Sequence, residues 1–124
     1  MNFGYSERDG TEADRTPTFV ELRRNPRFPI ESEVIIHSHS AGVLKGRAVD
    51  ISESGIAAMV AIEVPLNELV QLEFWLPEGL VEIEALVRQK NAFRYGFEFV
   101  EYGAPRDLVA KACRRMARDQ ATKK

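Results

Sequence analysis

The residues best suited to bind a charged ligand fall in two short segments. Residues 22–28 read Leu-Arg-Arg-Asn-Pro-Arg-Phe, and residues 50–55 read Asp-Ile-Ser-Glu-Ser-Gly. Guanidinium forks bind phosphates or the O6/N7 edge of guanine in a bidentate manner, and they stack on purines. A carboxylate accepts from the N1–H and N2–H donors of guanine, and a hydroxyl donates to phosphate oxygen. The two segments together indicate a ligand that carries phosphates and guanine edges.

Each segment also has a simpler interpretation when it is taken alone. Arg23, Arg24 and Arg27 fit an exposed basic loop, since arginines are mostly exposed. The pattern Asp50-x-Ser52-x-x-Gly55 fits a hairpin turn in which Asp and Ser satisfy the turn amides. Glycine at position 55 is explained by close approach of ligand or backbone, or by a positive φ angle at a bulge. Residue types alone leave both interpretations open.

Size and composition indicate one globular domain. The chain has 124 residues, of which 44% are hydrophobic and 29% are charged, enough for a core without disulfides. A net charge of −2 provides no general basic field, so we expect no DNA or RNA partner. No apolar run reaches the length of a membrane span or a signal peptide. The single cysteine fits a reducing compartment, and we expect a cytoplasmic protein without membrane insertion.

Short runs of apolar alternation dominate the middle of the chain. Alternation of period two predicts β-strands, and these strands are expected at residues 33–38, 43–51, 55–62, 69–76, 81–88 and 93–100. Hairpin-length gaps favour a mainly all-β fold, a six-stranded antiparallel β-barrel, with a β-sandwich as the alternative. Residues 55–62 are apolar on both faces, so we expect both faces to be covered. Phe93, Tyr95, Phe97 and Phe99 are expected to share the inner face.

The last element has helical period. Pro105 and Asp107 suit the first turn of a helix over about residues 104–118. Its apolar stripe is expected to cover a barrel mouth or the strand at 55–62, and it comprises Leu108, Val109, Ala112, Cys113 and Met116. We expect a flexible tail at residues 1–17, a domain at 18–118 and a frayed end at 119–124.

No catalytic arrangement emerges from the sequence, so we expect a protein that is not an enzyme and has no cofactor. His37 and His39 share a strand face but lack a third metal ligand at a recognised spacing. Cys113 lies on the apolar stripe, where a thiol behaves as a small hydrophobic group. Ser52 and Ser54 have no histidine base nearby in sequence.

The order and spacing of the two segments resemble the PilZ domain family. The resemblance consists of Arg23-x-x-x-Arg27, then Asp50-x-Ser52-x-x-Gly55, then strands that end in Tyr-Gly-Phe-Glu-Phe at 95–99 before a helix. It covers roughly residues 21–118 and all five signature positions. The resemblance implies a six-stranded barrel with a C-terminal helix that binds the bacterial second messenger cyclic di-GMP.

On the family's pattern, Arg23 and Arg27 would grip phosphates and guanines, with Arg24 as a further contact. Asp50 and Ser52 would contact guanine and phosphate from the barrel, and Gly55 would keep the strand approachable. Leu22 lies where side-chain bulk can decide between one ligand and a stacked pair. We expect ligand binding to order residues 18–28 and to change a surface read by an unidentified downstream protein, either near Trp75 or on the basic helix face.

Two other functions fit parts of the sequence. A PilZ-like adaptor that binds proteins and no nucleotide has the same fold, but the intact Arg and Asp-x-Ser motifs argue against it. A small oligonucleotide-binding barrel would call for exposed aromatic residues and a net basic surface, and neither matches this chain.

Overall fold

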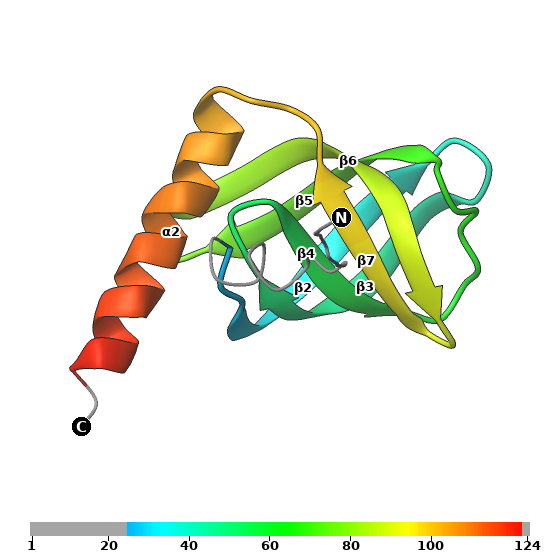
Figure 1. The fold of residues 1–124 in the computed structure, drawn as a ribbon. Helices are drawn as coiled ribbons and strands as arrows, with labels where there is room; N and C mark the ends of the chain where they lie inside the picture. Colours follow the sequence, from blue (N-terminus) through cyan, green and yellow to red (C-terminus); the bar gives the residue numbers. More distant parts are fainter. Residues whose placement is uncertain (1–24, 123–124) are drawn as a thin grey trace, which may run out of the picture.

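Six antiparallel strands and one helix make up the part of the chain that the structure, a computed structural model, describes, residues 25–122 (Figure 1). The strands are β2 (Phe28–Ser38), β3 (Gly42–Ile51), β4 (Gly55–Val60), β5 (Leu69–Leu76), β6 (Gly79–Asn91) and β7 (Arg94–Phe99). They close into a ring in the order β2-β3-β4-β7-β6-β5. The predicted barrel is therefore confirmed over the sandwich alternative.

Side chains alternate between the barrel interior and the outer surface, as period-two patterning requires. In β5, the side chains of Val70, Leu72, Phe74 and Leu76 are buried, whereas Trp75 is 67% exposed. The aromatic residues of β7 follow the same rule, and Tyr95 also accepts a hydrogen bond from the Val64 amide at 3.0 Å. This bond ties the β4–β5 connection to the core.

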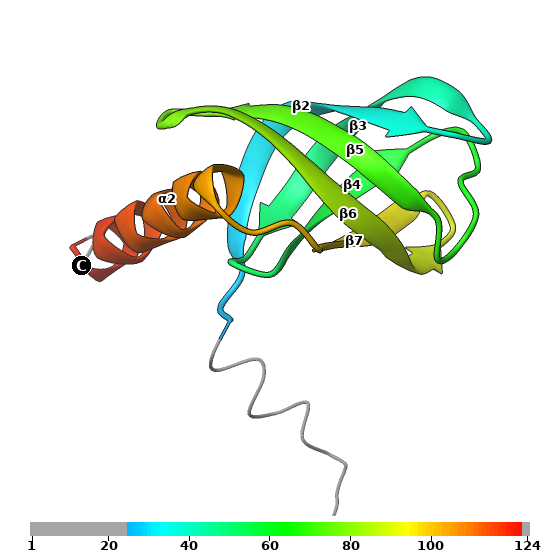
Figure 2. The same cartoon turned by 90° about the horizontal axis from the view of Figure 1, so that it is seen from above.

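The helix closes one end of the barrel. Helix α2 (Ala104–Ala121) buries Val109, Ala112, Cys113 and Met116 in the same apolar cluster as the strands. It contacts β6 and β2, so of the two surfaces expected for the apolar stripe, the barrel mouth is the covered one. Figure 2 shows the helix beside this end, with its last turns extending away from the barrel.

An ion pair fixes the helix to the β5–β6 hairpin. Arg115 donates from Nε and Nη2 to the Glu78 carboxylate, at 2.5 and 3.2 Å. The Arg115 guanidinium lowers the pKa of Glu78. The Glu78 side chain is only 9% exposed, so its charge is stabilised chiefly by the helix.

Ladder irregularities gather on one side of the ring. Register shifts occur between Pro29 and Ser32 in β2, between Ala48 and Asp50 in β3, and between Val87 and Gln89 in β6. Strand β5 pairs with β2 and β6 without any shift. A bulge re-aims the side chains beside it, so the β3, β4, β7 and β6 surface presents groups that regular alternation would not.

Some sequence expectations need correction. Phe93 is 59% exposed, because it lies in the β6–β7 turn before β7 begins at Arg94. Strand β4 ends at Val60, and Met59 and Ile62 are exposed, so only its first half is covered on both faces. The helix continues to Ala121, past the predicted end at 118. The proposed tail at residues 1–17 lies outside the described residues and stays a prediction.

Candidate functional site

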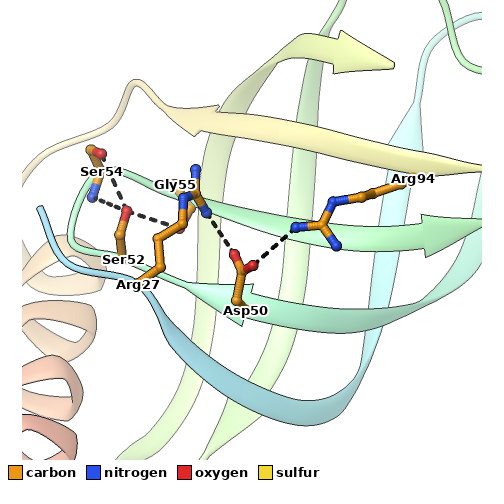
Figure 3. A network of polar contacts seen from close by, with 6 residues as sticks. All are labelled: Arg27, Asp50, Ser52, Ser54, Gly55 and Arg94. Atoms are coloured by element: carbon orange, nitrogen blue, oxygen red, sulfur yellow. Dashed lines mark hydrogen bonds and ion pairs between the residues drawn. The ribbon is translucent and has the colours of Figure 1, made fainter. Parts of the chain in front are cut away.

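Asp50 lies between two arginines on the outer surface of the barrel (Figure 3). Arg27 Nη1 donates to Asp50 Oδ1 at 2.6 Å, and Arg94 Nη2 donates to Asp50 Oδ2 at 3.0 Å. The Asp50 side chain is 17% exposed, whereas the two arginine side chains are 46% and 48% exposed. The carboxylate is therefore largely enclosed, and both guanidinium groups remain accessible to an anion.

Local folding explains how Arg27 reaches Asp50, 23 residues further along the chain. Phe28 is buried and pairs with Ile51 at the start of β2. Its neighbour Pro29 pairs with Asp50. The anchored Phe28 thus places the preceding arginine over the end of β3, where the bulge before Asp50 turns the carboxylate.

Arg94 is the first residue of β7. It pairs with Met59 of β4, and the inward Tyr95 beside it forces Arg94 outward by strand alternation. Between the two arginines, Ala57 is in register with both Asp50 and Gly96. This alanine is only 4% exposed, so the ion-pair cluster lies above a small apolar floor.

Ser52 organises the turn after β3. Its amide donates to the Gly55 carbonyl at 2.8 Å, and its hydroxyl accepts from the Ser54 amide at 3.2 Å. The two serine hydroxyls lie 3.3 Å apart. Ser52 is 1% exposed, so its first role is to hold the β3–β4 turn, as the hairpin interpretation of this motif predicted. Both serines nevertheless line a cavity.

Gly55 is required by the packing of two strands. A Cβ atom at this position would lie 2.4 Å from the carbonyl oxygen of Phe97 on β7. No side chain fits such a distance, so glycine allows β4 and β7 to pair at Gly55 and Glu98. Of the explanations open for this glycine, close approach of backbone is the one observed.

Two adjoining cavities flank the arginines. One of about 310 Å³ extends over Ser52, Ser54 and Gly55 to Arg88 and Glu98. The other, about 600 Å³, is lined by Arg94, Lys90 and Leu66. Both are lined by Arg27, Arg88, Gln89 and Gly96. Glycine at position 96 leaves room for the Gln89 side chain, because a Cβ atom there would lie 3.3 Å from it.

The cations around these cavities already have carboxylate partners. Arg88 Nε lies 3.1 Å from Glu98 Oε1, and Lys90 pairs with Glu63. This contact lowers the pKa of the Glu63 carboxyl and raises the pKa of the Lys90 ammonium. An anion at this surface would compete with these carboxylates for the basic side chains, and exposed ion pairs cost little to break.

Of the six predicted site residues, the structure brings Arg27, Asp50, Ser52 and Gly55 to one surface. Arg23 and Arg24, like Leu22, lie outside the described residues. Sequence reasoning missed Arg94, Arg88 and Ser54. Arg94 could have been found, because it precedes the inward Tyr95 and strand alternation points it outward. Ser54 belongs to the segment 50–55 and could also have been included. Arg88 could not be assigned, since the bulge between Val87 and Gln89 sets its direction.

Other candidate chemistry remains unsupported by the geometry. His37 Nε2 contacts Glu73 Oε1 at 3.3 Å, while His39 lies in the turn after β2. Residues 25–122 contain no cluster of three or more groups able to hold a metal ion. Burial raises the pKa of the Cys113 thiol to about 11, which keeps it neutral at pH 7. Within the described residues, no helix has the length and apolarity needed to cross a membrane.

The chain belongs to the PilZ domain family. The family model of the PilZ domain matches residues 21–111, which include the segments 22–28 and 50–55 and all six strands. No curated protein matches the chain.

Solved structures share the fold at low sequence identity. The PilZ domain of YcgR from Escherichia coli, solved with c-di-GMP, is 17% identical, with a TM-score of 0.60 over 82% of this chain and 98% of that one. The K. pneumonia MrkH–c-di-GMP complex is 16% identical, with a TM-score of 0.69 over 82% and 55%. The Bacillus subtilis inhibitor of motility MotI/DgrA is 24% identical, with a TM-score of 0.67 over 82% and 52%. The chain thus spans about half of the last two proteins.

Proposed function

We propose that this protein is a receptor for cyclic di-GMP, and that it binds the nucleotide across the two cavities beside Asp50. The observation that carries the proposal is the Arg27–Asp50–Arg94 cluster, in which two accessible guanidinium groups flank one carboxylate. Membership of the PilZ family and the cyclic di-GMP complexes of YcgR and MrkH support the choice of ligand.

Binding proceeds by exchange of partners. The N1–H and N2–H groups of guanine donate to the Asp50 carboxylate and replace one of its two arginines. The released guanidinium then binds a phosphate or the O6/N7 edge of the base. Arg94 is a ligand contact in this scheme, in addition to Arg27. Arg23 and Arg24 provide further guanidinium groups from the segment before β2.

The serine turn and the glycine have supporting roles. Ser52 and Ser54 line the smaller cavity, where a phosphate oxygen can accept from a serine hydroxyl. Gly55 acts through the β4–β7 pairing and leaves the strand surface open to the nucleotide.

Of residues 18–28, which were expected to become ordered on binding, Phe28 is already buried in β2 and Arg27 already contacts Asp50. Ligand binding orders the part of the segment before Arg27 against the barrel, because two phosphates neutralise arginines that otherwise repel one another. The changed surface then acts on a downstream protein, as a receptor without catalytic activity. Amide exchange of the part of residues 18–28 that precedes Arg27 should slow when cyclic di-GMP is bound. Unchanged exchange at saturation contradicts the ordering step while leaving binding itself intact.

Calorimetric titration tests the ligand. We expect saturable binding of cyclic di-GMP, much weaker binding of GTP, and no binding of a short single-stranded DNA. Absence of cyclic di-GMP binding by the folded protein would favour the nucleotide-independent adaptor. Equal affinity for the single strand would favour an oligonucleotide-binding barrel.

A further inference from the structure

The outer face of β5 and β6 carries a second organised surface, which we call the Trp75 face. It consists of Trp75, Leu80, Glu73, Glu82 and Glu84. Trp75 is 67% exposed and pairs across the strands with Leu80, which is 37% exposed. Exposed tryptophan is uncommon, and tryptophan is enriched at the centres of protein interfaces.

Carboxylates continue this face away from the apolar pair. Glu73 lies directly opposite Glu82, and Glu84 lies directly opposite Gln71. Like charges placed directly opposite one another destabilise a sheet. The described neighbours offset little of this charge, since Glu73 has one contact, at 3.3 Å, to His37. An arrangement that costs stability and has no packing role is expected at a functional surface.

The strand order places this face across the barrel from the arginines. In the ring β2-β3-β4-β7-β6-β5, strand β5 lies three positions from β4. The cluster at Asp50 occupies β3, β4 and β7, whereas the Trp75 face is centred on β5. A partner bound to the Trp75 face therefore leaves the candidate nucleotide site open.

We propose that the Trp75 face docks a basic amphipathic helix of a partner protein. Charge complementarity selects the partner, because the carboxylates repel anionic lipids and nucleic acids and attract Lys and Arg side chains. The barrel is closed, so backbone groups of β5 are engaged in ladders and recognition runs through side chains.

The spacing of the face suits a helix. Successive outward residues of a strand are about 6.8 Å apart, and β5 has no bulge to disturb them. One helical step from i to i+4 rises about 6 Å. A helix running along β5 can place an apolar residue on Trp75 and Leu80, then Lys or Arg one turn further, over Glu73 and Glu82, and again over Glu84.

A synthetic peptide tests the proposal on the full chain. The probe is an alanine-rich helical peptide without tryptophan, with leucine near one end and lysine one and two turns further along the same face. Trp75 is the only tryptophan in the sequence, so its emission reports on this face alone. We expect a saturable blue shift. A control peptide of the same composition, with its lysines on the opposite face, should bind at least about fivefold more weakly.

Two double variants distinguish the effect of the Trp75 face on peptide affinity from the effect of net charge. Glu73→Gln with Glu82→Gln should weaken binding about tenfold. The control pair, Glu53→Gln with Asp119→Asn, removes the same charge elsewhere and should leave affinity within about twofold. Trp75→Ala, followed by the anisotropy of a labelled peptide, should weaken binding about tenfold or more.

Four outcomes overturn the proposal. The first is no binding of the probe, and the second is binding without any change in Trp75 emission. The third is an equal loss of affinity in the control pair. The fourth is self-association of the protein that is abolished by the Glu73 and Glu82 changes, because the occupant would then be a second copy, with basic side chains of its own such as Lys111 and Arg114 on the face. All these readings are independent of cyclic di-GMP.

Discussion

The arginine side and the Trp75 side of the barrel share one architecture but differ in regularity. The described ladders contain three register shifts, one each in β2, β3 and β6, in ladders of the arginine side. Strand β5, by contrast, pairs regularly with both of its neighbours. Bulges gather unlike groups at irregular distances, as a small asymmetric ligand requires. Regular pairing repeats one spacing, which suits an extended partner.

The two sides also treat charge differently. Arg27, Arg88 and Arg94 each lie within 3.1 Å of a carboxylate. On the other side, Glu73 directly faces Glu82. On the arginine side, an anionic ligand can replace a carboxylate that already pairs with an arginine. On the Trp75 side, a cationic partner would reduce the repulsion between the carboxylates. Charges are therefore mostly paired at the proposed ligand site and mostly unbalanced on the proposed protein-binding surface.

The largest expected effect is on the arginine side. Arg27→Ala should weaken cyclic di-GMP binding by about 30- to 1000-fold, because a charge-assisted bidentate contact contributes on the order of 2–4 kcal/mol. Calorimetry measures this, with Arg118→Ala on the far turn of α2 as a charge-matched control. Equal affinity of wild type and Arg27→Ala refutes the site.

Arg94→Ala sharpens the exchange of partners. It should weaken binding about tenfold, less than Arg27→Ala, because Arg27 still holds Asp50 in place. In a double-mutant cycle with Asp50→Ala, the two changes should be strongly non-additive. Additive losses would mean that Arg94 and Asp50 act on the ligand independently.

Glu78→Gln tests whether the attachment of helix α2 affects stability without affecting binding at either side of the barrel. Loss of the charge-assisted bonds to Arg115 should lower the free energy of unfolding by about 1–2 kcal/mol without altering nucleotide or peptide binding. Urea unfolding followed by circular dichroism measures the difference, with Asp119→Asn as a control on the exposed partner of Arg115.

The pH dependence of this effect has a definite sign. The folded pKa of Glu78 lies below its ordinary value of 4.5. The contribution of ionised Glu78 to the free energy of unfolding is therefore complete above the ordinary pKa, and it is lost as the pH falls through the lower pKa of the folded state. The gap between wild type and Glu78→Gln should narrow in acid; a gap that widens there would contradict the assignment.

The smallest effects have opposite signs on the two sides. Glu82→Gln should raise the free energy of unfolding by about 0.2–0.5 kcal/mol, because it removes the like-charge contact with Glu73. Arg88→Gln should lower it by a similar amount through loss of the Glu98 pair. Parallel urea titrations compare the free energies of unfolding of the two variants. Changes of the same sign would show that the two sides do not differ in their electrostatics.

Periodicity predicted the barrel because inward positions are apolar in nearly every strand. It misplaced Phe93, since an aromatic residue in a turn has the same type as one in a strand. The Asp50 segment was recognisable by its own residues, but Arg94 needed the β4–β7 pairing to bring it near. The bulges that aim Arg88 and Asp50 have no residue signature of their own, so the sequence did not reveal them.

The lack of space for a Cβ atom at Gly55, which would lie 2.4 Å from the Phe97 carbonyl oxygen, affects how the residues of the motif should be interpreted. Any larger residue there would push β4 and β7 apart, and by opening the barrel it would abolish the proposed nucleotide binding. Such a variant would lose ligand affinity in a binding assay as a mutant without a ligand contact does, although the clash of its side chain is with the backbone of Phe97. A variant that tests the proposed nucleotide site is therefore better made at Arg27, because this residue precedes β2 and its side chain is 46% exposed, so a loss of affinity there would report on the ligand contact.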